Sequence, residues 1–135
     1  MLAETAAALA AGAMVVRGVD PYRAAVYTRH AEQLWNFADK YRGKYSDSFP
    51  VVEDFYKSWT GYKDEMAWGA AWLWRSTGSE LWAKRARQWY DESGSQYPGS
   101  EFSWDDKKPG VIALMAKITG EAKYSAALGP VFRLF

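Results

Sequence analysis

The stretch FYKSWTGYKDEMAWGAAWLWRST, residues 55–77, decides the fold of this chain. Its first part is rich in aromatic and turn-forming residues, which predicts a loop. Two adjacent carboxylates, Asp64 and Glu65, then stand where a helix should begin, and the residues after them are nearly all apolar. A helix that is apolar on all sides must be buried. We therefore expect residues 64–76 to form a helix inside the protein, with an aromatic loop before it.

An almost uncharged segment followed by an amphipathic one occurs three times in the chain. Apolar helices are predicted for residues 3–16, 64–76 and 111–118, and amphipathic helices for residues 21–42, 79–92 and 121–128. A glycine, Gly18, Gly78 or Gly120, follows each apolar segment and is expected to end its helix. The pattern predicts about three helical hairpins, each with a buried inner helix and a half-exposed outer helix.

The connections between these hairpins are long. Residues 43–54 and 94–108 contain proline, glycine, serine and aromatic residues, which predicts loops. Short turns inside the hairpins and long aromatic loops between them describe an α/α toroid whose loops form a ligand-binding face. We expect an all-α fold, a single incomplete domain over residues 1–135, with an apolar stub at residues 131–135.

Composition excludes several classes of function. The formal charge of +1 is spread along the 135 residues, so neither nucleic acid nor a membrane surface is expected as a partner. One histidine, His30, and no cysteine exclude a histidine- or thiolate-based metal site and a nucleophilic triad. Aromatic residues make up 17% of the chain, more than a small core needs. Some of these rings are expected to contact a ligand, and sugars, protein partners and single-stranded bases all suit them.

Loop aromatics are the best candidates for such contacts. They are Tyr56, Trp59, Tyr62 and Trp104. The tryptophans of the predicted helices, such as Trp68, Trp72 and Trp82, are expected to pack in the core instead.

Asp64 and Glu65 allow two interpretations. Acidic residues in the first turn of a helix complement its dipole by up to about 1 kcal/mol. Alternatively, they could bind calcium, which takes six to eight or so oxygen ligands. The further oxygen donors would be the backbone carbonyls of Thr60 and Gly61 and the carboxylate of Asp105 or Asp106. A glycosidase acid–base pair is a poor fit, because adjacent side chains on a helix diverge.

Three motifs in order resemble a known family. Residues 41–48 (YRGKYSDS), the run 55–74 and residues 102–110 (FSWDDKKPG) look like the middle of a glycoside hydrolase family 9 endoglucanase, a cellulase. The opening AETAAALAA, residues 3–11, is similar to the family as well. The resemblance covers about residues 2–130.

The resemblance implies a fold, an activity and a set of site residues. The family folds as an (α/α)6 barrel and hydrolyses internal β-1,4-glucosidic bonds of cellulose with inversion. The positions that resemble its calcium ligands are Thr60, Gly61, Asp64, Glu65 and Asp105, with Asp106 as the alternative to Asp105. Tyr56 and Trp59 match positions in the loop that meets glucose rings on the non-reducing side of the cut.

The catalytic residues of the family are missing. Its base lies in an Asp-Ala-Gly-Asp motif and its acid is a glutamate near the end of the catalytic domain, and neither motif occurs in this sequence. We therefore expect a fragment that is inactive alone. The alternative is a non-catalytic helical module that binds carbohydrate or protein. The family implies secretion, although Glu4 and the lack of a basic segment argue against a signal peptide here.

Overall fold

The computed structural model describes residues 1–97 and 101–132, and all regular secondary structure in these two ranges is helical. The elements in chain order are α1 (Leu2–Val16), α2 (Pro21–Lys40), α3 (Tyr45–Ser48), the 3-10 helix η1 (Pro50–Val52), α4 (Glu53–Tyr56), α5 (Lys63–Thr77), α6 (Glu80–Glu92), α7 (Lys108–Thr119) and α8 (Ala122–Phe132). The predicted all-α class is confirmed.

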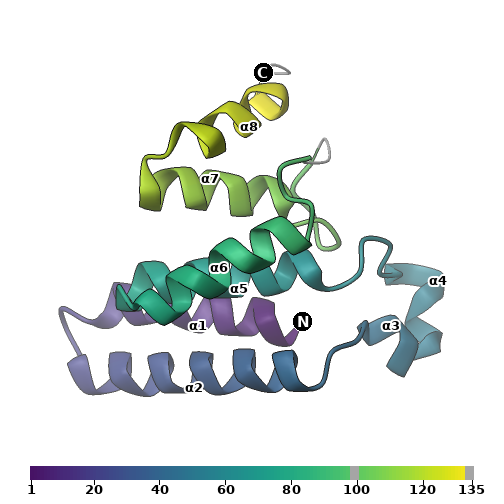
Figure 1. The fold of residues 1–135 in the computed structure, drawn as a ribbon. Helices are drawn as coiled ribbons and strands as arrows, with labels where there is room; N and C mark the ends of the chain where they lie inside the picture. Colours follow the sequence, from purple (N-terminus) through teal and green to yellow (C-terminus); the bar gives the residue numbers. More distant parts are fainter. Residues whose placement is uncertain (98–100, 133–135) are drawn as a thin grey trace.

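Six of these helices form three hairpins, as predicted. Helix α1 packs on α2, α5 on α6, and α7 on α8, while the inner helices α1, α5 and α7 pack in that order. Figure 1 shows the short turns within the hairpins at one end of the inner helices. The long connections lie at the other end, together with α3 and α4. The N-terminal ends of α1, α5 and α7 therefore face the long connections.

The inner helices approach each other closely because their facing residues are small. Helix α1 buries five alanines, and α5 buries Ala67, Gly69, Ala70 and Ala71. A Cβ atom at Gly69 would lie 2.7 Å from the backbone oxygen of Ala3 and 2.8 Å from Cδ1 of Trp35. Three helices thus meet at Gly69 without room for a side chain.

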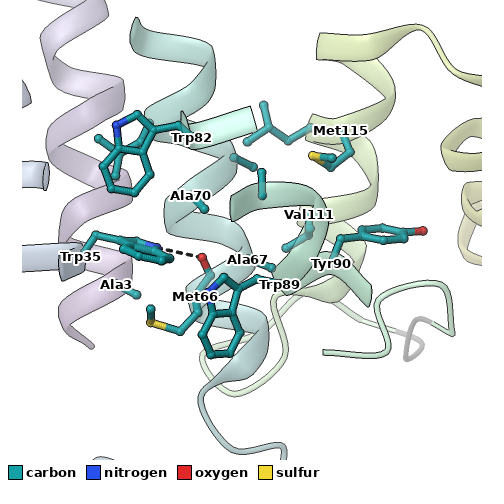
Figure 2. Close-up of a cluster of buried hydrophobic side chains, with 14 of the residues drawn as sticks. Ala3, Trp35, Met66, Ala67, Ala70, Trp82, Trp89, Tyr90, Val111 and Met115 are labelled. Atoms are coloured by element: carbon teal, nitrogen blue, oxygen red, sulfur yellow. Dashed lines mark hydrogen bonds between the residues drawn. The ribbon is translucent and has the colours of Figure 1, made fainter. Parts of the chain in front are cut away.

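The outer helices supply the buried tryptophans of the core. Trp35 of α2 and Trp82 and Trp89 of α6 are buried, and the ring centroids of Trp35 and Trp82 lie 5.1 Å apart in an edge-to-face arrangement. The indole nitrogen of Trp35 donates a hydrogen bond of 3.0 Å to the backbone oxygen of Met66 on α5 (Figure 2). The prediction that Trp82 packs in the core is confirmed. Trp68 and Trp72 are only half-buried and pair with each other.

Two predicted boundaries are wrong. Residues 43–54, predicted as a loop, contain α3, η1 and the start of α4, since helices this short leave no periodic pattern in a sequence. Helix α8 continues through Gly129 and Pro130 to Phe132, where the sequence predicts an end. The fixed φ of proline is a helical value, so the backbone can continue at the loss of one hydrogen bond. Residues 133–135 of the predicted stub lie outside the described residues.

The glycines after the inner helices differ in backbone conformation. Gly78 and Gly120 adopt left-handed conformations, with φ of 67° and 68°, and end α5 and α7 as predicted. Gly18 does not, and α1 ends at Val16 with Arg17 still in a right-handed conformation. The guanidinium of Arg17 donates a hydrogen bond of 2.8 Å to the backbone oxygen of Ser76, which ties the ends of α1 and α5 together.

None of the helices in the described part of the chain is long and apolar enough to cross a lipid bilayer.

Candidate functional site

The predicted site residues lie in two segments that precede inner helices. Residues 57–62 lead into α5, and residues 101–107 lead into α7. The carboxylate of Asp105 joins the two segments, because it accepts hydrogen bonds from the backbone N–H groups of Trp59 (2.8 Å) and Thr60 (3.1 Å). The hydroxyl of Thr60 donates in return to the backbone oxygen of Asp105.

The neighbouring carboxylate has a different partner. Asp106 accepts a hydrogen bond of 2.9 Å from the backbone N–H of Lys108, in the first turn of α7. Asp106 precedes Lys107, the N-cap of α7, and in the described structure no hydrogen bond joins its carboxylate to the Thr60 segment. Of the two alternatives that the sequence left open, the structure therefore brings Asp105 to the predicted site.

A tight turn returns the chain from Thr60 to α5. Gly61 has a φ of 98°, which only glycine adopts without strain, and its backbone oxygen accepts a hydrogen bond of 2.9 Å from the hydroxyl of Ser58. The need for a glycine at this position is thus conformational.

Asp64 and Glu65 are both buried at the start of α5, with exposed fractions of 1% and 4%. One oxygen of Asp64 accepts a hydrogen bond of 2.7 Å from the backbone N–H of Lys107. The other oxygen of Asp64, Oδ1, and Oε2 of Glu65 are buried without a hydrogen-bond partner in the described structure. A buried oxygen without a partner costs about 1–3 kcal/mol, so these two atoms mark an incomplete arrangement.

The two carboxyl groups also perturb each other. Burial, and then the charge of Asp64, raise the pKa of Glu65 to about 9. Burial raises the pKa of Asp64 as well. The two carboxyl groups thus influence each other's pKa, but this does not make them the acid and base of a glycosidase. Both are too deeply buried to reach a sugar, so they are suited to holding a cation or a proton.

The described residues contain no group of three carboxylate or imidazole side chains that could by itself hold a metal ion. Any ion at Asp64 and Glu65 would need oxygen donors of another kind.

The aromatic surface, which we define as Tyr56, Trp59 and Trp104, lies around Asp105, which follows Trp104 in the chain and accepts a hydrogen bond from the backbone N–H of Trp59. The three residues are 61%, 74% and 53% exposed. The rings of Tyr56 and Trp104 meet edge to face with their centroids 5.7 Å apart, and the ammonium of Lys57 lies 5.2 Å from the Trp59 ring. Tyr62, by contrast, is half-buried against the core residue Trp89. The aromatic surface combines rings from both segments.

Sequence reasoning missed the residues that support this surface. Phe102 lies on Trp68 with ring centroids 5.5 Å apart, and a Cβ atom at Gly110 would lie 2.5 Å from the Phe102 ring. A glycine inside a helix is a signal for such a close approach, so Gly110 could have been noticed. Lys107, which is buried, carries no signal in the sequence that sets it apart from Lys108.

The chain is similar to proteins of one family over nearly its whole length. The model of glycosyl hydrolase family 9 matches residues 1–131. Endoglucanase B of Cellulomonas fimi is 46% identical over 128 residues, which cover 90% of this chain and 12% of that protein. The endoglucanase structure from the termite Nasutitermes takasagoensis is 43% identical and superposes with a TM-score of 0.91 over 96% of this chain and 30% of that one.

A more distant structure is endoglucanase CelQ from Clostridium thermocellum, complexed with cellotetraose. It is 28% identical, with a TM-score of 0.77 over 96% of this chain and 21% of that one. The chain belongs to glycosyl hydrolase family 9. Its fold is that of about a third of the termite enzyme, which confirms the predicted part of an (α/α)6 barrel. The chain spans less than a third of each of these relatives.

Proposed function

We propose that this chain is the part of a secreted endo-β-1,4-glucanase that binds glucose units of cellulose next to the point of cleavage. The aromatic surface is the observation that carries the proposal. Its three exposed rings suit the apolar faces of pyranoses. The hydrogen bonds of Asp105 hold the backbone at Trp59 beside the Trp104 segment, and the ring of Tyr56, at the end of α4, packs edge to face on Trp104. The CelQ structure with cellotetraose shows that a protein of this fold binds such an oligosaccharide.

Asp64, Glu65 and Asp105 are not placed to hydrolyse a glucan. An inverting glycosidase needs an acid and a base about 6.5–9.5 Å apart, on either side of the sugar. Near the aromatic surface, Asp64 and Glu65 are buried and Asp105 is engaged by backbone N–H groups. We therefore expect the chain to bind glucan without cleaving it, with acid and base supplied by other parts of the whole enzyme.

A titration with cellotetraose, followed by tryptophan fluorescence, tests the binding. We expect a saturable change that Trp59→Ala weakens by about tenfold, because an aromatic contact contributes about 1–2 kcal/mol. Tyr22→Ala is the matched control, since Tyr22 is 81% exposed at the opposite end of the inner helices. Equal affinities of the two variants, or no binding by the unaltered chain, would overturn the proposal.

The same site is a candidate for calcium. We expect Asp64 and Glu65 to hold the ion together with the backbone oxygens of Thr60 and Gly61. Asp105, the fifth candidate, does not form a three-carboxylate group with them in the described structure, so its carboxylate would have to move towards the ion. The unpartnered oxygens of Asp64 and Glu65 fit a hard cation, which would supply the missing interaction. Oδ2 of Asp105 accepts from a single N–H group and retains acceptor capacity, whereas Oδ1 accepts from two. A bound ion would hold the aromatic segments against α5 and would take no part in bond cleavage.

Thermal unfolding in calcium and in a chelator tests this proposal. An ion present at 100 times its dissociation constant stabilises the folded state by about 2.7 kcal/mol, so the unfolding temperature should rise. We expect Asp105→Asn to abolish the rise and Asp106→Asn, the matched control, to retain it. An unfolding temperature that is the same with calcium and with chelator would contradict the site.

A further inference from the structure

The ammonium group of Lys107 is buried at the N-terminal ends of the inner helices. The side chain is 8% exposed, and a lysine is rarely buried so deeply unless it is paired. Its nitrogen lies 2.8 Å from a carboxylate oxygen of Glu4 in the first turn of α1. It also donates to the backbone oxygen of Ser103 and lies 5.3 Å from the Phe102 ring centroid. The side chain therefore joins α1 to the segment before α7.

The backbone of Lys107 makes a second connection. Its N–H donates the hydrogen bond of 2.7 Å to Asp64 in the first turn of α5, and Lys107 itself is the N-cap of α7. One residue thus links the beginnings of the three inner helices α1, α5 and α7.

Residues 103–106, the segment that Lys107 anchors, are joined to one another by hydrogen bonds. The backbone N–H of Ser103 donates to the backbone oxygen of Asp106, and the hydroxyl of Ser103 accepts from the backbone N–H groups of Asp105 and Asp106. A segment held in this way moves as a unit. Fixing its Ser103 end to the Lys107 ammonium consequently fixes the direction of Trp104 and Asp105 as well.

We propose that Lys107 is a positioning residue: its buried ammonium, paired with Glu4, sets the orientation of the Trp104–Asp105 segment and thereby the glucan affinity of the aromatic surface. A charged hydrogen bond is about twice as strong as a neutral one, which explains why an ammonium rather than an apolar side chain serves here. The part of the proposal that concerns glucan rests on the function proposed above. The orientation of the segment does not depend on it.

Hydrogen exchange of single backbone amides, measured by NMR, tests the positioning role directly. The N–H groups of Trp59 and Thr60 report the contact with Asp105, and the N–H of Ala31 in α2 reports global unfolding. In Lys107→Met we expect Trp59 and Thr60 to exchange about tenfold faster relative to Ala31. The control is Lys108→Met, which removes a neighbouring charge and should leave this ratio unchanged.

A milder variant provides the test in case Lys107→Met does not fold. Glu4→Gln keeps the shape of the side chain and removes its charge, so we expect about threefold faster exchange at Trp59 and Thr60. The double variant with Lys107→Met should exchange no faster than Lys107→Met alone, because both changes remove one interaction. If Lys107→Met does not fold, Glu4→Gln decides the question. The proposal is overturned if Trp59 and Thr60, relative to Ala31, exchange no faster in these variants than in Lys108→Met.

The titration with cellotetraose separates this inference from the proposed function. We expect Lys107→Met to weaken binding severalfold and Lys108→Met to leave it unchanged. If the unaltered chain does not bind cellotetraose, the proposed function fails, while the exchange of Trp59 and Thr60 still decides whether Lys107 positions the segment. If the unaltered chain binds and Lys107→Met binds equally well, the inference about affinity fails.

Discussion

Gly69 is the residue whose size matters most for the packing of the inner helices. A methyl group there would collide with the backbone of α1 and the ring of Trp35, neither of which can move freely. We expect Gly69→Ala to lower the free energy of unfolding by about 1–2 kcal/mol, because overpacking outweighs the gain in helix propensity. Urea denaturation measures this change.

The matched control for that substitution is Gly12→Ala. A Cβ atom at Gly12, in the middle of α1, would lie at an ordinary contact distance of 3.6 Å from the Tyr27 ring. Alanine should therefore stabilise the protein there by about 0.5–1 kcal/mol. A loss of stability at Gly12 as large as that at Gly69 would show that the inner helices do not meet at Gly69.

Glu65 gives the metal-free protein an unusual pH dependence. Its pKa is about 9 in the folded chain, compared with an ordinary value of 4.5, so between these values the folded state holds a proton that the unfolded state has released. In the presence of a chelator, stability should accordingly fall as the pH rises from about 5 towards 9. Glu65→Gln, measured by thermal unfolding, should remove most of this fall. The exposed Glu101→Gln should retain it, and identical pH profiles of the two variants would contradict the burial of Glu65.

At the scale of elements, the sequence predicted the long helices and missed the short ones. Helix α5 was predicted for residues 64–76 and spans Lys63–Thr77, because its apolar pattern and glycine stop are local signals. Helices α3 and α4 are four residues long, and contacts distant in sequence, such as that from the Tyr45 hydroxyl to the Tyr56 backbone, accompany them. Local patterns carry no information on such contacts.

The packing of α2 on α5 depends on Trp35. Trp35→Phe removes the hydrogen bond to the backbone oxygen of Met66 and leaves space beside Trp82 and Gly69. We expect a loss of about 2–4 kcal/mol in the free energy of unfolding, measured by urea denaturation. Phe37→Leu, at a half-exposed position of the same helix, should change stability by less than about 0.5 kcal/mol. Similar losses in both variants would argue against Trp35 as the anchor.

At the scale of the whole molecule, alternating inner and outer helices could be predicted because burial leaves a composition pattern. The sequence predicted that the candidate residues belong to one site. It did not distinguish Asp105 from Asp106, because the two residues are adjacent and chemically identical. In the structure the Asp105 carboxylate accepts from the backbone N–H groups of Trp59 and Thr60, whereas the Asp106 carboxylate accepts from that of Lys108. Nor could the sequence predict the Lys107–Glu4 pair, whose partners are more than 100 residues apart. A contact between residues so far apart in the sequence forms only when the hairpins pack together.

We propose that the chain binds β-1,4-glucan without cleaving it. Isothermal titration calorimetry with cellotetraose tests both halves in one measurement, since binding gives a heat pulse that returns to the baseline and hydrolysis gives a continuing heat flow. We predict saturable pulses that return to the baseline and are diminished by Trp59→Ala. A continuing heat flow after each injection, or no heat beyond dilution, would contradict the account.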